Sequence, residues 1–231
     1  MATVILLRHG RSTSNTSGTL AGRSRGVHLD DLGREQAERA GRRLADVPLR
    51  RVVSSPLERC RETATLVAAH HAGLKVTTNR GLLECDYGDW TGRAIADLTK
   101  EKLWRAVQRQ PASVTFPGGE SMAAMQARAV AAVRTLDAQV EAEHGADAVW
   151  VAVSHGDPIK AVLADATGMH LDQFQRLVVD PASISIVRYT AERPYVLGLN
   201  THDGDLGWLR PRKRRRGRRD DTVVGGGAGP E

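Results

Sequence analysis

The sequence predicts an α/β protein in which helices cover both faces of a mostly parallel sheet. Apolar runs typical of buried strands alternate along the chain with amphipathic helical segments, an order that favours parallel strands joined by helical crossovers. The 231 residues, 41% of them hydrophobic, suffice for one domain with its own core. We therefore expect a single domain followed by a tail.

Three strand candidates alternate with two helix candidates in the N-terminal half. The first strand, residues 3–8, is apolar or β-branched up to Arg8, as expected of a strand buried on both faces. Small and apolar residues recur at helical spacing over residues 32–47, which predicts a first helix. Pro56 suits the first turn of a second helix. In order, the expected elements are a strand at 3–8, a helix at 32–47, a strand at 50–55, a helix at 56–71 and a strand at 74–79.

Longer helices and a hairpin are expected in the C-terminal half. Ser121 can cap a long helix that ends near Glu143. The run "AVWVAVSHG" (148–156) reads as another buried strand. The remaining expected elements are a helix at 97–109, a helix from Asp157 to about Ala166, and edge strands or a hairpin at 184–190 and 194–200.

The net charge of +6 comes almost entirely from the C-terminal end. From Arg210 onward there are eight Lys or Arg and three acidic residues, which leaves 25 basic and 24 acidic residues before it. We expect the folded domain at 1–205. The basic, Gly-rich tail at 206–231 is expected to be disordered and to bind polyanions weakly and without specificity.

Targeting and redox signals favour the cytoplasm. The chain has no apolar run long enough to span a membrane, and its first residues do not resemble a signal peptide. Cys60 and Cys85 are too few for a disulfide framework.

Polar residues follow three of the predicted strands at the point where each strand ends. Arg8-His9-Gly10 ends the first strand, "SSPLER" places Arg59 just after the second, and Ser154-His155-Gly156 ends the strand near 150. The carboxyl ends of parallel strands meet at one edge of a sheet, where ligands bind in folds of this class. Two histidines and two arginines are therefore expected to converge there.

These motifs, with "LLECDYGDWTG" (82–92), resemble the histidine phosphatase superfamily in its phosphoglycerate-mutase-like branch, over about residues 3–200. The resemblance implies a three-layer α/β/α sandwich, a phosphohistidine intermediate, and no metal or other cofactor. Its site residues are carried over by motif: the nucleophile His9, the proton donor Glu84, and a phosphate pocket formed by Arg8, Arg59, His155 and Asn15, with Gly10, Ser12 and Gly156 expected beside them.

The chemistry explains these residue types. A phosphoryl group in transfer carries negative charge that arginine forks and backbone N–H groups after Gly10 can stabilise. His9 must be neutral to attack, whereas His155 would serve better as a protonated, cationic donor. Glu84 must hold a proton near neutral pH, which requires burial or a nearby negative charge. As alternatives, Ser12 and Asn15 could simply be turn residues, and Glu84 a surface acid.

The same branch contains mutases and phosphatases. Arg105 stands where mutases keep a substrate-binding arginine, and Arg11 and Arg23 are further candidate cations. The mutases carry cations where this chain has Ile95 and Ala106, which favours a phosphomonoester hydrolase acting on a small phosphorylated metabolite. The alternative is a phosphoglycerate mutase or related phosphomutase.

Three other classes of function are less favoured. A nucleic-acid-binding protein would depend wholly on the tail, and a metal site at His9, His155 and Asp86 lacks a short ligand spacing. A catalytically inactive phospholigand sensor is disfavoured by the complete set of motifs. The apolar segments at 184–199 could provide the edge of a homodimer.

Overall fold

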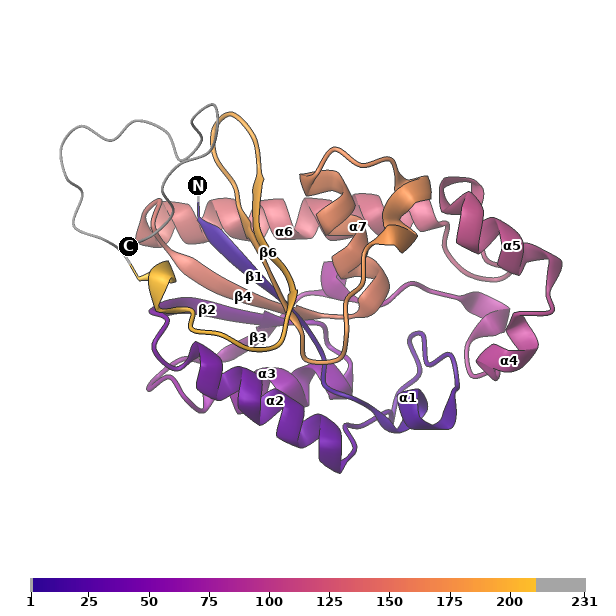
Figure 1. Cartoon of the computed structure of the whole chain (residues 1–231), viewed down its shortest axis with the longest axis horizontal. Helices are drawn as coiled ribbons and strands as arrows, with labels where there is room; N and C mark the ends of the chain where they lie inside the picture. The colour runs from indigo at the N-terminus through magenta and orange to yellow at the C-terminus, as the bar shows by residue number, and fades with distance from the viewer. Residues whose placement is uncertain (1, 211–231) are drawn as a thin grey trace.

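One mixed sheet organises the computed structural model, which describes residues 2–210 (Figure 1). Its strand order is β3-β2-β4-β1-β5-β6, and the first four strands in this order run parallel. The strands are β1 (Thr3–Arg8), β2 (Leu49–Ser54), β3 (Val76–Thr78), β4 (Val149–Ser154), β5 (Ile184–Arg188) and β6 (Tyr195–Thr201). The predicted hairpin is confirmed: β5 lies antiparallel between β1 and β6, and β6 forms the edge.

Helices cover both faces of this sheet, which confirms the predicted three-layer α/β/α sandwich. Figure 1 shows α2 and α3 on one side and α6 and α7 on the other. The helices are α1 (Thr13–Ser17), α2 (Asp31–Leu44), α3 (Glu58–Ala68), α4 (Ile95–Leu98), α5 (Lys102–Arg109), α6 (Met122–His144) and α7 (Gly156–Ala166).

Strand β1 shows how the layers are built. Its successive side chains point to opposite faces. Ile5 and Leu7 belong to the core cluster that includes residues of α2 and α3, while Val4 and Leu6 belong to the cluster of α6 and α7. All four side chains are buried, so the continuous apolar run follows from the two helical layers.

The predicted helix at 97–109 is wrong in its continuity, because the chain forms two helices, α4 and α5. Glu101 has an extended backbone, with φ −71° and ψ 143°. The break follows from the spacing of the apolar residues: Leu98 and Leu103 are five positions apart and would lie on different faces of one helix. With the break, Leu98 and Val107 are both buried in one cluster, and Leu103 packs against it.

The predicted domain boundary at residue 205 lies too early in the chain. Leu206 and Leu209 are 3% and 5% exposed and join the core cluster on the α2 side. Arg43 of α2 holds the segment that precedes these two leucines, because it donates to the carbonyl oxygens of Thr201 and Gly204 at 3.0 and 2.9 Å. The rest of the predicted tail, 211–231, lies outside the described residues.

This packing predicts that two truncations will behave differently. Ending the chain after Asp205 removes two buried leucines and should lower the free energy of unfolding by about 3–5 kcal/mol. Ending it after Arg210 keeps both leucines and should leave stability and catalysis unchanged. Urea unfolding and the kcat of both truncated proteins test this. Equal stability of the two would show that Leu206 and Leu209 contribute nothing to the core.

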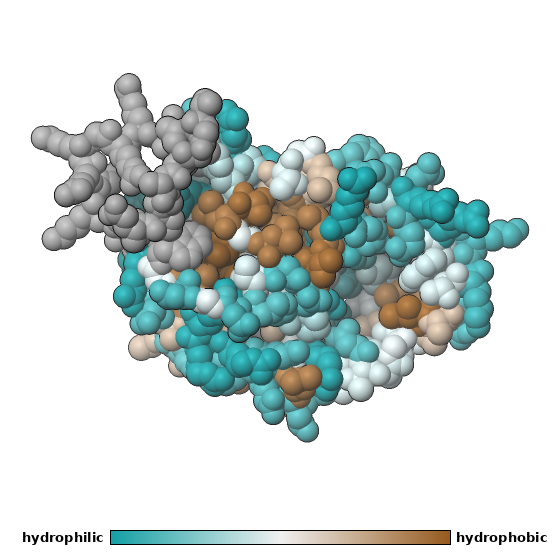
Figure 2. Space-filling view, in the orientation of Figure 1, coloured by the Kyte–Doolittle hydropathy of each residue, from teal (hydrophilic) through white to brown (hydrophobic). Residues whose placement is uncertain are grey.

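Apolar side chains are exposed near the edge strand. Leu197 and Leu199 of β6 are 37% and 38% exposed, and Val178 is 55% exposed. Figure 2 shows a hydrophobic area on the face of the molecule where the β5–β6 hairpin lies. A homodimer through this edge stays a prediction. Among residues 2–210, no helix combines the length and apolar character that crossing a membrane requires.

Candidate active site

The site forms where β1, β4 and β2 end side by side. Hydrogen bonding continues past the strand ends, because the His9 N–H donates to the Ser154 carbonyl at 3.0 Å and the Ser55 N–H donates to the Val153 carbonyl at 2.8 Å. The segments that follow the strands are thereby held together. The rings of His9 and His155 meet edge to face with their centroids 5.2 Å apart, so the structure brings the two motif histidines together.

His9 is arranged as a nucleophile. Its Nδ1 lies 2.7 Å from the Gly10 carbonyl oxygen, which can only accept, so the ring proton resides on Nδ1 and Nε2 keeps its lone pair. The Nε–H of Arg59 donates to that Nε2 at 3.3 Å, a hydrogen bond that must give way when the lone pair attacks a substrate. Burial, followed by the charges of Arg59 and Arg8, holds the pKa of His9 well below its usual value. The imidazole is therefore neutral at physiological pH.

The buried Arg59 and the half-buried Arg8 flank His9, and each has a buried N–H donor without a partner among residues 2–210. Arg59, which is 2% exposed, donates from Nη2 to the Gly22 carbonyl at 2.8 Å, while its Nη1 is buried without a partner among the described residues. Arg8 donates from Nη1 to the Val179 carbonyl at 2.6 Å, and its Nε is likewise buried and unpartnered there. Buried donors without acceptors are costly, so these atoms are suited to receive an anion.

His155 differs from the expectation that it would be cationic. It is completely buried, with Nε2 2.8 Å from the Ser55 hydroxyl and 3.4 Å from the Cys60 sulfur. Burial, followed by the charge of Arg59 and with a further contribution from Arg8, lowers its pKa well below the usual value. His155 is therefore neutral in this structure. Its protonation would require a phosphate dianion in the site, whose charge opposes these effects.

The backbone N–H groups after Gly10, which are predicted to contribute to an anion site, bind within the protein in this structure. Gly10 donates to the Thr63 hydroxyl at 3.1 Å. The next three N–H groups are also engaged: Arg11 with Gln36, Ser12 with Asn15 and Thr13 with His28. A Cβ on Gly10 would lie 2.3 Å from the Gly33 carbonyl oxygen. Glycine is needed here for the close approach of α2, and binding of phosphate at Gly10 stays a prediction.

The other small pocket candidates occupy different places. Gly156 begins α7 beside Arg8, whose guanidinium is the group nearest to a Cβ built on this glycine. Ser12 and Asn15 form a capping box at the start of α1, in which the Asn15 side-chain oxygen accepts from the Ser12 N–H at 3.0 Å. A structural role explains their positions. Binding of phosphate by Ser12, Asn15 and Gly156 stays a prediction.

Glu84 is fixed through its backbone. Its carbonyl oxygen accepts from Arg23 Nε and from Arg128 Nη2, both at 2.9 Å. Its carboxylate oxygen Oε1 accepts from the Cys85 N–H at 2.9 Å. Anchoring the main chain in this way holds the carboxyl group in place while leaving its second oxygen for a ligand.

The environment of Glu84 favours its protonated form. Burial, followed by the negative charge of Asp157, raises the pKa of Glu84 to about 7, although the Cys85 N–H and the charges of Arg59 and Arg8 oppose the rise. Glu84 is half-buried in the structure, so the expected burial is partial. The nearby negative charge that Glu84 needs is supplied by Asp157, so it does not have to come from bound phosphate alone.

An ion-pair network that sequence reasoning missed supports the Glu84 segment. Glu120 accepts from Arg128 of α6 at 2.6 Å and from Arg23 at 2.9 Å, and Arg128 also donates to the carbonyl oxygens of Gly81 and Leu83. These residues are far apart in the sequence, and no motif joins them. Thr63, Ser55 and Asp157 were missed as well, although Ser55 and Asp157 adjoin motif residues.

Within the described part of the chain, the structure shows no cluster of side chains that would support the alternative of a metal site. Among residues 2–210, no group of three or more His, Cys, Asp or Glu side chains is placed to hold a metal ion. Cys60 and Cys85 are both free and buried, and burial raises the pKa of Cys60 to about 12. Both therefore remain thiols under ordinary conditions.

The two catalytic candidates predict a bell-shaped pH dependence. His9 must be deprotonated, so kcat/KM should fall as the pH drops through a pKa below 6.5. Glu84 must be protonated, so kcat/KM for an alkyl phosphate should fall as the pH rises through about 7. The control is Glu84→Gln, which should lose the alkaline limb. An unchanged alkaline limb in that variant would assign it to another group.

Comparison with known proteins establishes the family. The model of the histidine phosphatase superfamily (branch 1) matches residues 4–202. Phosphoserine phosphatase 1 of Hydrogenobacter thermophilus is 31% identical over 202 residues, covering 87% of this chain and 92% of that protein. A probable phosphoglycerate mutase, GpmB, of Yersinia enterocolitica is 32% identical over 201 residues, covering 85% and 88%.

A solved structure agrees in fold. A mycobacterial glucosyl-3-phosphoglycerate phosphatase, in complex with VO3, superposes with a TM-score of 0.77 at 27% identity, covering 86% of this chain and 98% of that one. The fold and the pair of histidines with flanking arginines define a phosphoryl-transfer enzyme. The chain belongs to the histidine phosphatase superfamily (branch 1).

Proposed function

We propose that the protein hydrolyses phosphomonoesters of small metabolites through a phosphohistidine on His9, without a metal or other cofactor. The geometry around His9 carries this proposal. The Nε2 lone pair of His9 accepts from Arg59. Arg59 Nη1 and Arg8 Nε are buried donors without a partner among residues 2–210, and the charges of both arginines act on His9. A nucleophile flanked by buried cationic donors suits a phosphoryl group, which carries its charge on three oxygens.

In the first step, His9 Nε2 attacks phosphorus while the bond from phosphorus to the ester oxygen breaks. Arg8 and Arg59 stabilise the charge on the transferring group. Glu84 gives its proton to the departing oxygen, so the alcohol leaves neutral and Glu84 becomes a carboxylate. The Nδ1–H of His9 keeps its proton and donates to the Gly10 carbonyl oxygen in both steps, which fixes the orientation of the ring.

In the second step, water attacks the phosphohistidine. Glu84 takes a proton from the water, the bond between phosphorus and nitrogen breaks, and inorganic phosphate leaves. His9 returns to its neutral form and Glu84 to its acid form. A pKa near 7 lets Glu84 perform both transfers at neutral pH.

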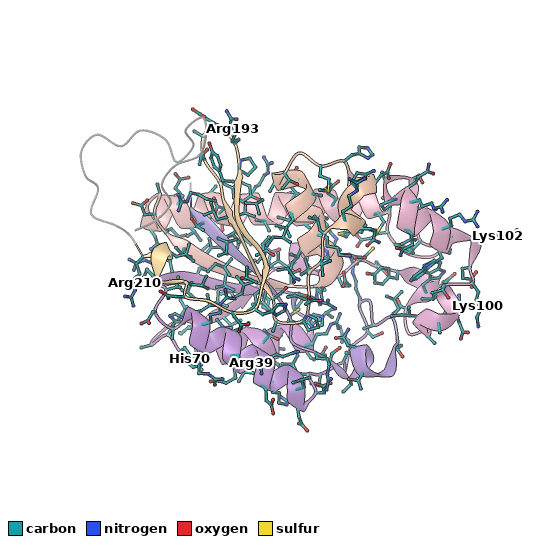
Figure 3. The ribbon with its side chains drawn as sticks, viewed as in Figure 1. Arg39, His70, Lys100, Lys102, Arg193 and Arg210 are labelled. Atoms are coloured by element: carbon teal, nitrogen blue, oxygen red, sulfur yellow. The ribbon has the colours of Figure 1, made fainter. Side chains whose placement is uncertain are left out.

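The structure also bears on the mutase alternative. Two of the three candidate cations are occupied by acids: Arg11 pairs with Asp30 at 2.6 Å, and Arg23 pairs with Glu120. Arg105 lies exposed on α5. Figure 3 shows Lys100 and Lys102 at the outer periphery of α4 and α5, where Lys100 pairs with Asp97. These pairings leave few cations to hold the carboxylate of a phosphoglycerate.

The test compares hydrolysis with isomerisation on one preparation, in the presence of excess chelator. Phosphate release is measured on phosphoserine, the phosphoglycerates, glucosyl-3-phosphoglycerate and sugar phosphates. A coupled assay follows exchange between 2- and 3-phosphoglycerate, with and without bisphosphoglycerate. We expect phosphate release to exceed isomerisation by at least 100-fold, since each missing charge-assisted contact costs about 1.5–3 kcal/mol. Faster isomerisation would identify a mutase, and loss of activity with chelator would contradict metal independence.

A further inference from the structure

The segment that carries Glu84 is joined to the start of α7 by a partly buried hydrogen bond. The Tyr87 hydroxyl donates to Asp157 Oδ2 at 2.8 Å. Tyr87 is 6% exposed, and its ring meets Phe116 edge to face at 5.0 Å, so its hydroxyl is held firmly. Asp157 lies in the first turn of α7, two residues after His155. This contact therefore places a carboxylate beside the catalytic segment.

Charged groups act on the Glu84 carboxyl from several elements. The cations are Arg8 at the end of β1 and Arg59 of α3, and both favour the ionised form. From α6 and the loop after α1, Arg128 and Arg23 bind the carbonyl oxygen, with Glu120 between them, and the Cys85 N–H binds the carboxylate. His155 is neutral, and the Cys60 and Cys85 thiols are protonated. Asp157 is the anion that opposes the two cations.

A conflict follows from this arrangement. The arginines that stabilise phosphate also stabilise the carboxylate of Glu84, which would remove the proton that the leaving group needs. Burial opposes this effect, and the charge of Asp157 adds to the opposition. Tyr87 keeps its own proton, because burial and the charge of Asp157 raise its pKa well above 10. It therefore remains a donor that holds Asp157 in place.

We propose that Asp157, held by Tyr87, is a positioning residue that keeps the proton on Glu84 in the presence of the phosphate-binding arginines. The proposal deepens the proposed function and rests on it. No new chemical step is involved, because Asp157 acts on Glu84 by its charge and does not touch the reacting atoms. The pair thereby sets the upper pH limit for substrates whose leaving group needs a proton.

Asp157→Asn tests this, because it removes the charge and keeps an oxygen that can accept from Tyr87. For an alkyl phosphate, the alkaline limb of kcat/KM should move about one unit lower, so activity near pH 8 falls about tenfold, whereas activity near pH 6 falls by about twofold at most. For p-nitrophenyl phosphate, whose leaving group needs no proton, the loss should be much smaller. In a Glu84→Gln background, Asp157→Asn should have no further effect.

The matched control is Asp165→Asn on the same helix, where the acid pairs with the exposed Arg134. It should leave both pH profiles unchanged. Tyr87→Phe should produce a partial shift in the same direction as Asp157→Asn, because the charge remains but its anchor is lost. An equal loss at every pH and for both substrates, or no change in Asp157→Asn, would overturn the proposal.

Direct titration of the Glu84 carboxyl separates this proposal from the proposed function. Carbon-13 NMR of the free enzyme, assigned with Glu84→Gln, should show the Glu84 titration moving to lower pH in Asp157→Asn. This readout needs no turnover and also applies if the variant loses activity. Absence of phosphohistidine in the wild type would refute the proposed function, whereas an unmoved Glu84 titration would refute only the role of Asp157.

Discussion

Replacing His9 by Ala should lower kcat for phosphate release by about 10⁴-fold or more, because it removes the atom that forms the covalent intermediate. Wild-type enzyme quenched without acid after a short reaction with labelled substrate should carry an adduct that is acid-labile and base-stable, and His9→Ala should carry none. The side chain is 4% exposed and lies at the end of β1, so the variant is also checked for native stability.

The matched control for this prediction is His144→Ala at the end of α6, which should keep both the adduct and full activity. A labelled adduct on another residue would assign the nucleophile elsewhere. Full activity in His9→Ala would exclude the phosphohistidine mechanism altogether.

Replacing Arg59 by Met should lower kcat/KM by about 10²–10³-fold, because it removes a preorganised cationic donor from the transferring phosphoryl group. The methionine keeps an apolar stem in a buried position, but the Gly22 carbonyl loses its donor, so the variant is also checked for native stability. The same change should raise the pKa of His9, since the Arg59 charge lowers it. The acid limb of the pH profile should then move to higher pH.

Arg61→Met, two residues further on the exposed face of α3, is the control and should leave kcat/KM unchanged. A pH profile and a saturation curve on each variant give both quantities. An acid limb that does not move in Arg59→Met would show that Arg59 does not set the charge state of His9. Normal kcat/KM would remove Arg59 from the phosphate site.

The fold was predictable because its central strands are buried on both faces. A continuous apolar run such as β1 or β4 is visible without knowledge of partners, and Ser121 caps α6 as its residue type suggests. The missed features depend on packing. The break between α4 and α5 and the burial of Leu206 and Leu209 require knowing which surface each segment meets.

The site was predictable to the extent that its residues follow strands directly. His9 and His155 were placed together because parallel strands end at one edge. The support for Glu84 was not predictable, since Arg128 meets the Glu84 carbonyl across 44 positions of sequence. Gly10 illustrates a third case. The sequence predicts it as a phosphate-binding residue, but in the structure its backbone contacts Gly33 and donates to Thr63.

The anchoring of Glu84 by Arg23, Glu120 and Arg128 gives the proton donor a support in α6 that His9 and Arg8 do not share, in addition to the contact of its segment with α7. The residues that bind phosphate lie at the ends of strands and in α3, whereas the segment that carries the proton donor Glu84 is bound by Arg128 of α6. Evolution can therefore remodel the chain between residues 80 and 120 to accept new leaving groups while the nucleophile and its arginines stay fixed. Chimeras that exchange this stretch among relatives, together with its α6 anchor, should inherit the substrate range of the donor and the phosphohistidine chemistry of the recipient.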